Sequence, residues 1–150
     1  MAERIKHQLF FPHPPRAVWE YLTNAELMAI WLMKSDFQPI LGHEFQFRVN
    51  PVPSLDFDGI VYCRVLEIIP FEKLSYSWKL GPGDGVINLD SVVRWELHPK
   101  DNGTELILDH GHFTIIENLG ILNAMNKGWL DNMNKIAAHL NQSTHDTTNA

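Results

Sequence analysis

His110 and His112, two residues apart in a β-rich run, are the first candidates for chemistry. Alternate residues of a strand point to one side, so regular pairing would place both imidazoles on the same face of a sheet. Two imidazoles begin a metal site, which normally needs three or four ligands, but strand parity turns the neighbouring Asp109 away. Gly111 between them could also introduce a bulge that ends the shared orientation. We therefore expect a hydrogen-bonded structural histidine at position 110 and no metal site.

Other catalytic and cofactor signatures are absent from the sequence or incomplete. It contains no G-x-S-x-G, G-x-G-x-x-G or Walker pattern. Residues 56–59 resemble the start of a calcium loop, but the glutamate required six positions after the glycine is Val65. The single cysteine, Cys63, lies in a β-rich run and is expected to be a small buried hydrophobe. No cofactor is therefore expected, and His110 and Tyr76 are the weak candidates for an acid or base.

The N-terminal part of the chain predicts one strand followed by two short helices. Residues 4–11 alternate in polarity and end at a proline-rich turn, residues 12–15. Proline suits the first turn of a helix because its missing N–H would be unpaired there, so a helix should cover residues 14–22. Residues 23–26, Thr-Asn-Ala-Glu, fit the S/T-x-x-E capping box. A second short helix is therefore expected over residues 24–31.

Strand patterns dominate the middle of the chain. Alternating polarity and β-rich composition predict strands over residues 44–49, 59–69, 73–80, 93–97 and 104–112. The last two should form a hairpin through Asp101-Asn102-Gly103, since an Asn-Gly pair accepts positive φ. Together with the first strand, these segments predict an antiparallel sheet that presents one aromatic face.

The C-terminal part contains the strongest helix signal. Spacings of three and four residues join one apolar stripe, which consists of Leu122, Met125, Trp129, Met133, Ile136 and Leu140. Gly128 interrupts the helix at a cost of about 1 kcal/mol relative to alanine, and could permit close approach to the sheet. The polar residues 141–150 are expected to form a flexible tail. Residues 1–140 would then make up one domain, with the helix packed on the aromatic face.

Composition and charge narrow the class of protein further. The chain has 150 residues, which suits one domain, and its 45% hydrophobic fraction excludes bulk disorder. No apolar run approaches the ~20 residues of a membrane helix. The first residues lack an apolar signal core, so a cytoplasmic protein is expected. Twelve Lys and Arg against 18 Asp and Glu give a net charge of −6, which disfavours nucleic acids and anionic lipids as partners.

Motifs in this order resemble the START-like helix-grip superfamily (SRPBCC). The subfamily they resemble is the one named after the C-terminal domain of the activator of heat-shock protein 90 ATPase. The matching segments are Pro15-Arg16-Ala17-Val18-Trp19, Leu27-Met28-Ala29-Ile30-Trp31, Leu41 to Phe47, Gly59 through Tyr76 and Trp78, Gly103 to His110, and Gly128-Trp129. The family's helix signature has leucine where this chain has Met133. The resemblance implies an α+β fold, in which a curved antiparallel sheet of about six strands wraps around a long C-terminal helix.

The resemblance also implies a cavity between the sheet and that helix. Ligand pockets are mostly apolar, with a few polar groups that fix orientation. The residues expected to bind a ligand there are Trp31, Phe45, Phe47, Tyr76, Trp78, Trp95, His110, Met125, Trp129 and Met133, with Trp31 near the mouth. Tyr76, His110 and the indole N–H groups would supply the polar contacts. The alternative is that the same side chains simply fill the core.

Three functions are compatible with these residues and this resemblance. The favoured one is noncatalytic binding of a small hydrophobic or aromatic molecule, lipid-like or polyketide-like. The second is an enzyme that acts on such a ligand, with His110 or Tyr76 as an acid or base at hydrogen-bond distance from the reacting proton. The third is a chaperone-linked protein-interaction domain, which only the resemblance to the subfamily supports.

Overall fold

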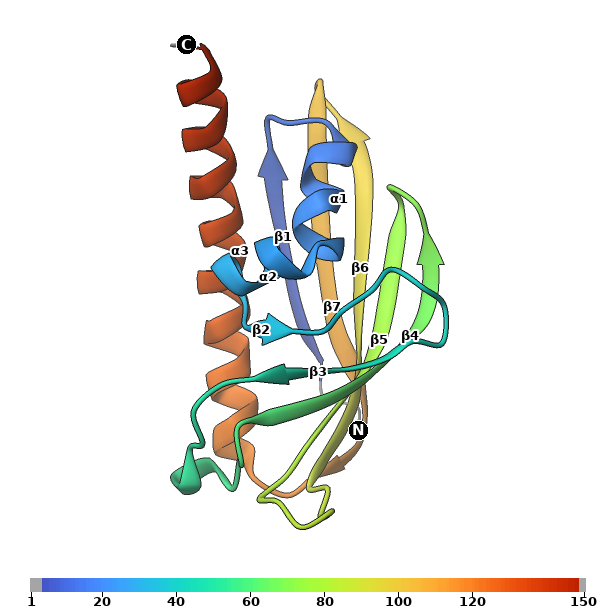
Figure 1. Cartoon of the computed structure of the whole chain (residues 1–150), viewed down its shortest axis with the longest axis vertical. Helices are drawn as coiled ribbons and strands as arrows, with labels where there is room; N and C mark the ends of the chain where they lie inside the picture. The colour runs from blue at the N-terminus through green and yellow to red at the C-terminus, as the bar shows by residue number, and fades with distance from the viewer. Residues whose placement is uncertain (1–3, 149–150) are drawn as a thin grey trace.

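A seven-stranded antiparallel sheet forms one wall of the computed structural model, which describes the backbone of residues 4–148 and the side chains of residues 4–142. The strands are β1 (Ile5–Phe11), β2 (Lys34–Ser35), β3 (Glu44–Arg48), β4 (Ile60–Ile69), β5 (Lys73–Leu80), β6 (Leu89–Lys100) and β7 (Gly103–Ile116). Their order in the sheet is β1-β7-β6-β5-β4-β3-β2, so only β1 leaves the sequential meander (Figure 1). The strand beyond the predicted six is the two-residue β2, which is too short to leave a periodic signal.

Two short helices follow β1, as predicted. They are α1 (Pro15–Thr23) and α2 (Ala25–Trp31), and a 3-10 turn, η1 (Pro53–Leu55), follows β3. The cap of α2 is Asn24, whose Oδ1 accepts hydrogen bonds from the backbone N–H groups of Glu26 and Leu27. Thr23 instead donates its hydroxyl to the carbonyl of Trp19, in the last turn of α1. The predicted capping box is therefore wrong by one residue, because Thr23 completes the preceding helix.

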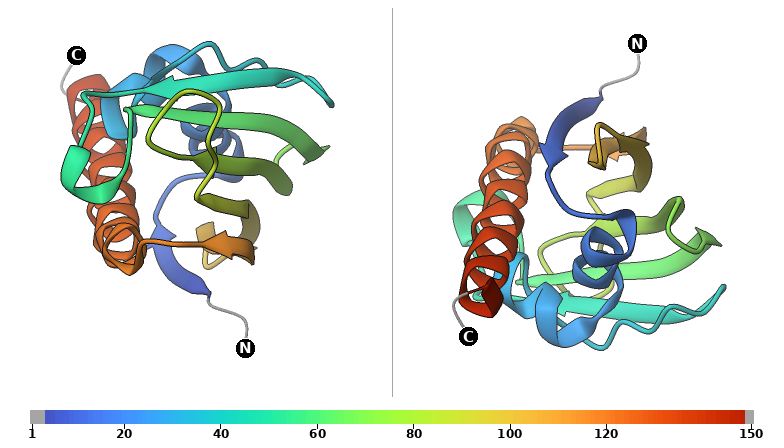
Figure 2. Two further views of the ribbon diagram at one scale, coloured as in Figure 1. Left: turned by 90° about the horizontal axis from the view of Figure 1, so that it is seen from below. Right: turned by 90° about the horizontal axis from the view of Figure 1, so that it is seen from above.

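The long helix α3 (Leu119–Thr148) closes the open side of the curved sheet (Figures 1 and 2). Seen along α3, the sheet curves around the core, and α1 and α2 lie on the same side of the sheet as α3 (Figure 2). The buried residues of the predicted stripe are Trp129, Met133, Ile136 and Leu140, while Leu122 and Met125 are half-buried. None of the described helices is long and apolar enough to cross a membrane. This arrangement confirms the predicted helix-grip fold.

The helix α3 extends beyond the boundary predicted at residue 140. Its backbone stays helical through Thr148. Asn141, in the segment expected to be a tail, is hydrogen-bonded to His13, with 2.7 Å between Asn141 Oδ1 and His13 Nε2. The helix and its contacts therefore continue past the predicted boundary, while residues 1–140 as a single domain stay a prediction. Residues 149–150 lie outside the described chain, and flexibility of the tail stays a prediction.

The β6–β7 hairpin forms where the sequence predicts it, with different residues in the turn. Asp101 and Asn102 adopt positive φ of 48° and 62°, as both central residues of a type I′ turn do. Gly103 already pairs with Lys100 as the first residue of β7. A Cβ at Gly103 would lie 2.3 Å from the carbonyl oxygen of Phe11. This glycine is therefore required by close approach to β1 and not by the turn itself.

Candidate functional site

His110 lies on β7 and is fully buried, with 0% of its surface exposed. Its Nδ1 accepts a hydrogen bond from Trp129 Nε1 at 2.9 Å. This assigns the imidazole proton to Nε2, which lies 2.7 Å from Ser91 Oγ. The Ser91 hydroxyl in turn donates to the backbone carbonyl of Trp78 at 2.9 Å. Both imidazole nitrogens are thus satisfied inside the protein, which confirms the structural histidine expected from the sequence.

Burial also holds His110 and Tyr76 in their neutral forms. Removal from water lowers the pKa of His110 to about 3. Burial raises the pKa of Tyr76 well above its ordinary value, although the hydrogen bond from Trp95 Nε1 at 3.0 Å opposes that rise. Tyr76 is 1% exposed, and neither Tyr76 nor His110 lines either of the two hollows described below. An acid or base must lie within hydrogen-bond distance of the proton that it transfers, so this burial counts against the acid–base alternative.

His112 does not share the orientation of His110. The pairing of β6 with β7 shifts register between Asp90 and Val92, and His112 has a positive φ of 55°. Its side chain is exposed, so the simple parity expectation is wrong and the bulge considered at Gly111 is present. Among residues 4–142, no group of three or more His, Cys, Asp and Glu side chains lies close enough to hold a metal ion.

A small apolar recess opens between the end of α2, β5 and α3. It is open at the surface, has a volume of about 110 Å³ and is lined by Leu32, Met33, Trp78, Met125, Gly128, Trp129 and Asn132; we call it the α2–α3 recess. A Cβ added at Gly128 would meet no atom within 4 Å. The close approach to the sheet considered for Gly128 is therefore wrong, because its missing side chain leaves open space at the recess.

The α2–α3 recess brings together three of the predicted ligand-binding residues. These are Trp78, Met125 and Trp129. The remaining predicted residues are buried in the core: Trp31, Phe45, Phe47, Tyr76, Trp95, His110 and Met133. Sequence reasoning missed Leu32, Met33 and Asn132. A signal existed for part of this set, since Asn132 follows Met125 by seven residues and shares its helix face, and Leu32 directly follows Trp31.

Trp78 has an unusual indole for so buried a side chain. Its surface is 3% exposed, and its Nε1 finds no hydrogen-bond acceptor among the residues that the structure describes. Neighbouring indoles are satisfied, since Trp95 donates to Tyr76 and Trp31 donates to the carbonyl of Tyr21 at 2.7 Å. A buried donor without an acceptor costs about 1–3 kcal/mol. The unpaired N–H therefore marks Trp78 as the exception within a core of satisfied polar groups.

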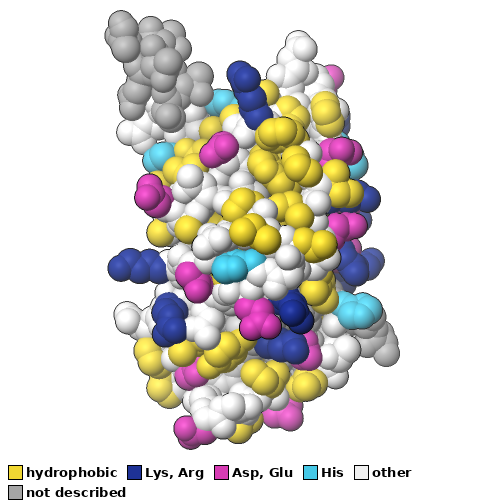
Figure 3. All heavy atoms as spheres, turned by 45° about the vertical axis from the view of Figure 1, so that its right-hand side comes forward, with side chains coloured by type: hydrophobic (Ala, Val, Ile, Leu, Met, Phe, Trp, Pro, Cys, Tyr) yellow, Lys and Arg dark blue, Asp and Glu magenta, His cyan; other side chains and the backbone are white. Residues whose placement is uncertain are grey.

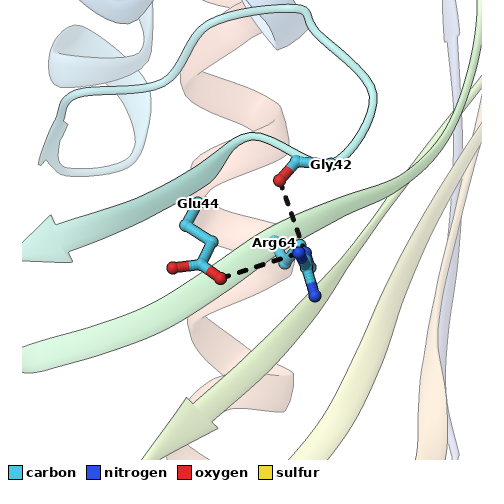
Figure 4. Close-up of polar contacts among 3 residues, drawn as sticks. All are labelled: Gly42, Glu44 and Arg64. Atoms are coloured by element: carbon cyan, nitrogen blue, oxygen red, sulfur yellow. Dashed lines mark hydrogen bonds and ion pairs between the residues drawn. The ribbon is translucent and has the colours of Figure 1, made fainter.

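A larger hollow lies over β3, β4 and β5, on the face of the sheet that points away from the core. This outer groove has a volume of about 570 Å³ and is lined by Asp36, Glu44, Phe45, Gln46, Arg48, Tyr62, Cys63, Arg64, Ser77 and Lys79. Figure 4 shows Arg64 donating to the Gly42 carbonyl at 3.4 Å and lying 3.8 Å from the Glu44 carboxylate. Both charged side chains are exposed, so their attraction is weak. The charged lining of the outer groove suits a polar partner better than a hydrophobic molecule.

Comparison with protein families decides the classification. The sequence profile of the family described as "Activator of Hsp90 ATPase homolog 1-like protein" matches residues 12–141. The chain belongs to this family. The match begins directly after β1 and covers all later strands and most of α3. It therefore includes the α2–α3 recess and the outer groove. Among curated proteins, none matches the chain significantly.

Solved structures share the fold of this family member. Protein MLL2253 from Mesorhizobium loti is 29% identical, with a TM-score of 0.79 over 93% of this chain and 98% of that one. CalU16 from Micromonospora echinospora is 20% identical, with a TM-score of 0.68 over 93% and 74%. The Aha1 dimer from Colwellia psychrerythraea is 16% identical, with a TM-score of 0.70 over 90% and 93%. The last two likenesses show the fold alone.

Proposed function

We propose that this protein binds a small hydrophobic molecule in the α2–α3 recess. The observation that carries the proposal is the open space at Gly128, beside a lining that is almost entirely apolar. Small-molecule sites are mostly apolar hollows with a small number of polar groups that fix the orientation of the ligand. The helix-grip fold supports the proposal, since the recess lies where the sheet and the long helix meet.

The size of the recess limits what binds without rearrangement. An engineered cavity of roughly 150 Å³ holds benzene, and the recess encloses about 110 Å³. One small ring is therefore the largest apolar group that the recess takes without rearrangement. A lipid-like or polyketide-like molecule would require Leu32 and Met33 to move, and these two half-buried residues are the whole connection between α2 and β2. Methionine adapts readily because its unbranched chain has three rotatable bonds.

Filling the recess from within tests the proposal. Gly128→Leu places an isobutyl group into the open space, and it replaces a poor helix former by a good one. The variant should therefore fold at least as stably as the natural chain while it loses ligand binding. The measurement is an amide NMR titration of both proteins with a mixed set of small aromatic and aliphatic compounds. In the natural chain, shifts should cluster on Met125, Gly128 and Trp129.

Ala138→Leu is the matched control, because it adds a comparable side chain at an exposed position of the same helix. This variant should bind as the natural chain does. If Gly128→Leu bound the same compounds with unchanged affinity, the recess would not be the site. If no compound shifted any resonance of the recess in the natural chain, binding of small hydrophobic molecules would be refuted.

A second candidate function is protein binding, favoured by exposed hydrophobic side chains near the outer groove. Leu66, Ile69 and Phe71 on the β4–β5 hairpin are between 39% and 49% exposed, and Leu41 nearby is 64% exposed. Figure 3 shows hydrophobic side chains gathered on this side of the molecule. The partner to test is heat-shock protein 90, after which the family is named. A complex weakened by Leu41→Asp would support the candidate, and a pull-down without a complex would remove it.

A further inference from the structure

The outer groove gathers positive charge on a chain that is negative as a whole. Arg48, Arg64 and Lys79 belong to its lining, against two acidic residues, Asp36 and Glu44. The whole chain has the opposite balance, with 12 Lys and Arg against 18 Asp and Glu. The volume of the groove, about 570 Å³, lies within the range of small-molecule sites, which is roughly 300–1,000 Å³. The outer groove therefore has the size and the local charge of a site for a small anion.

The register of the sheet places the three cations around one tyrosine, Tyr62. Tyr62 on β4 pairs directly with Lys79 on β5 and with Gln46 on β3. Residues paired in this way have Cβ atoms about 5 Å apart, and diagonal neighbours lie roughly 7–8 Å apart. Arg48 is such a diagonal neighbour, and Arg64 follows Tyr62 by two residues on the same side of β4. Arginine and lysine side chains are long enough to span these separations, so the three charges can act on one group held over Tyr62.

The two arginines keep donors that no acidic partner takes up. Arg64 Nε donates to the Gly42 carbonyl and one Nη lies 3.8 Å from Glu44, which leaves the other Nη directed away from both partners (Figure 4). Arg48 donates to the neutral side chain of Gln46 and forms no ion pair with a described residue. Both arginine side chains are exposed, so an anion reaches them without rearrangement of the fold.

The other charged contacts of the lining are weak or directed at the backbone. Lys79 Nζ lies 3.9 Å from Asp90 Oδ2, which is beyond hydrogen-bond distance, and the Lys79 side chain is 45% exposed. Asp36 Oδ1 accepts a hydrogen bond from the backbone N–H of Gln46 at 2.8 Å, which fixes this carboxylate at the edge of β3. An incoming anion therefore competes with no strong ion pair at Arg48 or Lys79.

We propose that the outer groove binds small aromatic molecules that carry a phosphate or carboxylate group. The anionic oxygens accept hydrogen bonds from Arg48, Arg64 and Lys79, because the guanidinium fork matches both groups. The aromatic ring packs against Tyr62, whose half-buried side chain forms no hydrogen bond or ring contact with another described residue. Lys79 and the recess residue Trp78 are neighbours on β5, so the groove and the α2–α3 recess lie on opposite faces of the sheet. This site is therefore independent of the proposed hydrophobic function.

The probe is phenyl phosphate, and inorganic phosphate and benzyl alcohol each lack one half of it. Each compound is titrated into the natural chain and followed by amide NMR. Phenyl phosphate should shift the resonances of Tyr62, Arg64 and Lys79 and leave those of Met125 and Gly128 at the recess in place. At the groove it should bind at least about fivefold more tightly than either partial compound. Added salt should weaken its binding, because exposed charges are screened.

A double variant tests the role of the charges. Arg48→Gln combined with Arg64→Gln removes two exposed charges, so the chain should fold as the natural one does, which thermal denaturation checks. The dissociation constant of phenyl phosphate should rise by about five- to thirtyfold. Arg94→Gln is the matched control, because Arg94 is exposed on β6 and does not line the groove. Its dissociation constant should stay within about twofold of the natural value.

Each contrary result overturns a defined part of the inference. Unchanged affinity in the folded double variant would overturn the site, as would the absence of any phenyl phosphate shift at the groove in the natural chain. Equal affinity for inorganic phosphate would overturn the role of the aromatic ring at Tyr62. None of these results touches the α2–α3 recess, which is tested separately with uncharged compounds and Gly128→Leu.

Discussion

Two indoles in the core, Trp78 and Trp129, differ in whether the N–H group finds a hydrogen-bond acceptor among the described residues. Their ring centroids lie 5.1 Å apart, and both side chains are at least 97% buried. Trp129 donates to His110, which leads on through Ser91 to a backbone carbonyl. Trp78 donates to no described residue. The hydrogen bonds that join Trp129, His110 and Ser91 stabilise the fold, whereas the buried N–H of Trp78 contributes no hydrogen bond to it.

The largest effect on stability is expected from removing His110, the central residue of the hydrogen-bonded series Trp129–His110–Ser91. His110→Leu keeps a similar volume but leaves Trp129 Nε1 buried without an acceptor. The free energy of unfolding should fall by about 2–4 kcal/mol, measured by guanidinium denaturation. His112→Asn is the control, because His112 is exposed and asparagine tolerates its positive φ. A loss below about 1 kcal/mol in His110→Leu would contradict the structural role assigned to the histidine.

The same histidine should make stability depend on pH. The pKa of His110 is lowered from its ordinary 6.5 to about 3 in the folded chain. Between these values the unfolded chain binds a proton that the folded chain does not, so stability is full above pH 6.5 and falls as the pH is lowered toward 3. The slope from this group approaches about 1.4 kcal/mol per pH unit. The difference between the natural chain and His110→Leu isolates it, and equal slopes would contradict the buried neutral imidazole.

Replacing each of the two tryptophans by phenylalanine compares their contributions to stability directly, with a smaller expected effect. Trp129→Phe removes a hydrogen bond as well as packing, whereas Trp78→Phe removes packing and an unsatisfied donor. Trp129→Phe should therefore be less stable than Trp78→Phe by about 1–2 kcal/mol. Thermal or chemical denaturation of the two variants measures this difference. Equal stability would mean that Trp78 Nε1 has a partner in solution.

The smallest effect concerns the recess itself. Gly128→Ala should stabilise the chain by about 0.5–1 kcal/mol, since alanine is the better helix former and its Cβ meets no neighbouring atom. The same methyl group should weaken ligand binding. Denaturation curves and ligand titration of one variant check both effects. A destabilised Gly128→Ala would show that the space beside Gly128 is closed in solution.

Much of the architecture is predictable from periodicity, because alternation and helical spacing reflect which side chains face the core. Residues 73–80 form β5 as predicted, and the apolar stripe forms the inner side of α3. The bulge at His112 was only one possibility, since no local signal distinguishes a glycine that bends a strand from one that does not. Asn141 was missed because its partner, His13, is distant in sequence.

The candidate site was less predictable than the fold. The aromatic and methionine residues predicted to bind a ligand mostly fill the core, because patterning identifies buried positions without giving the volume left between them. Gly128 shows this limit, since the same residue type permits close packing at Gly103 and leaves empty space at position 128. The unpaired donor of Trp78 depends on the positions of all neighbouring acceptors, which only the folded structure defines.

Xenon binding followed through the methionine methyl groups tests the central claim most directly, because xenon enters apolar cavities without requiring any particular functional group. Met33 and Met125 line the α2–α3 recess, whereas Met28 and Met133 are fully buried elsewhere in the core. In a chain labelled at its methionine methyl groups, xenon should shift the Met33 and Met125 resonances progressively and leave those of Met28 and Met133 in place. If Met33 and Met125 stayed unchanged under xenon pressure, the recess would not be an apolar binding site.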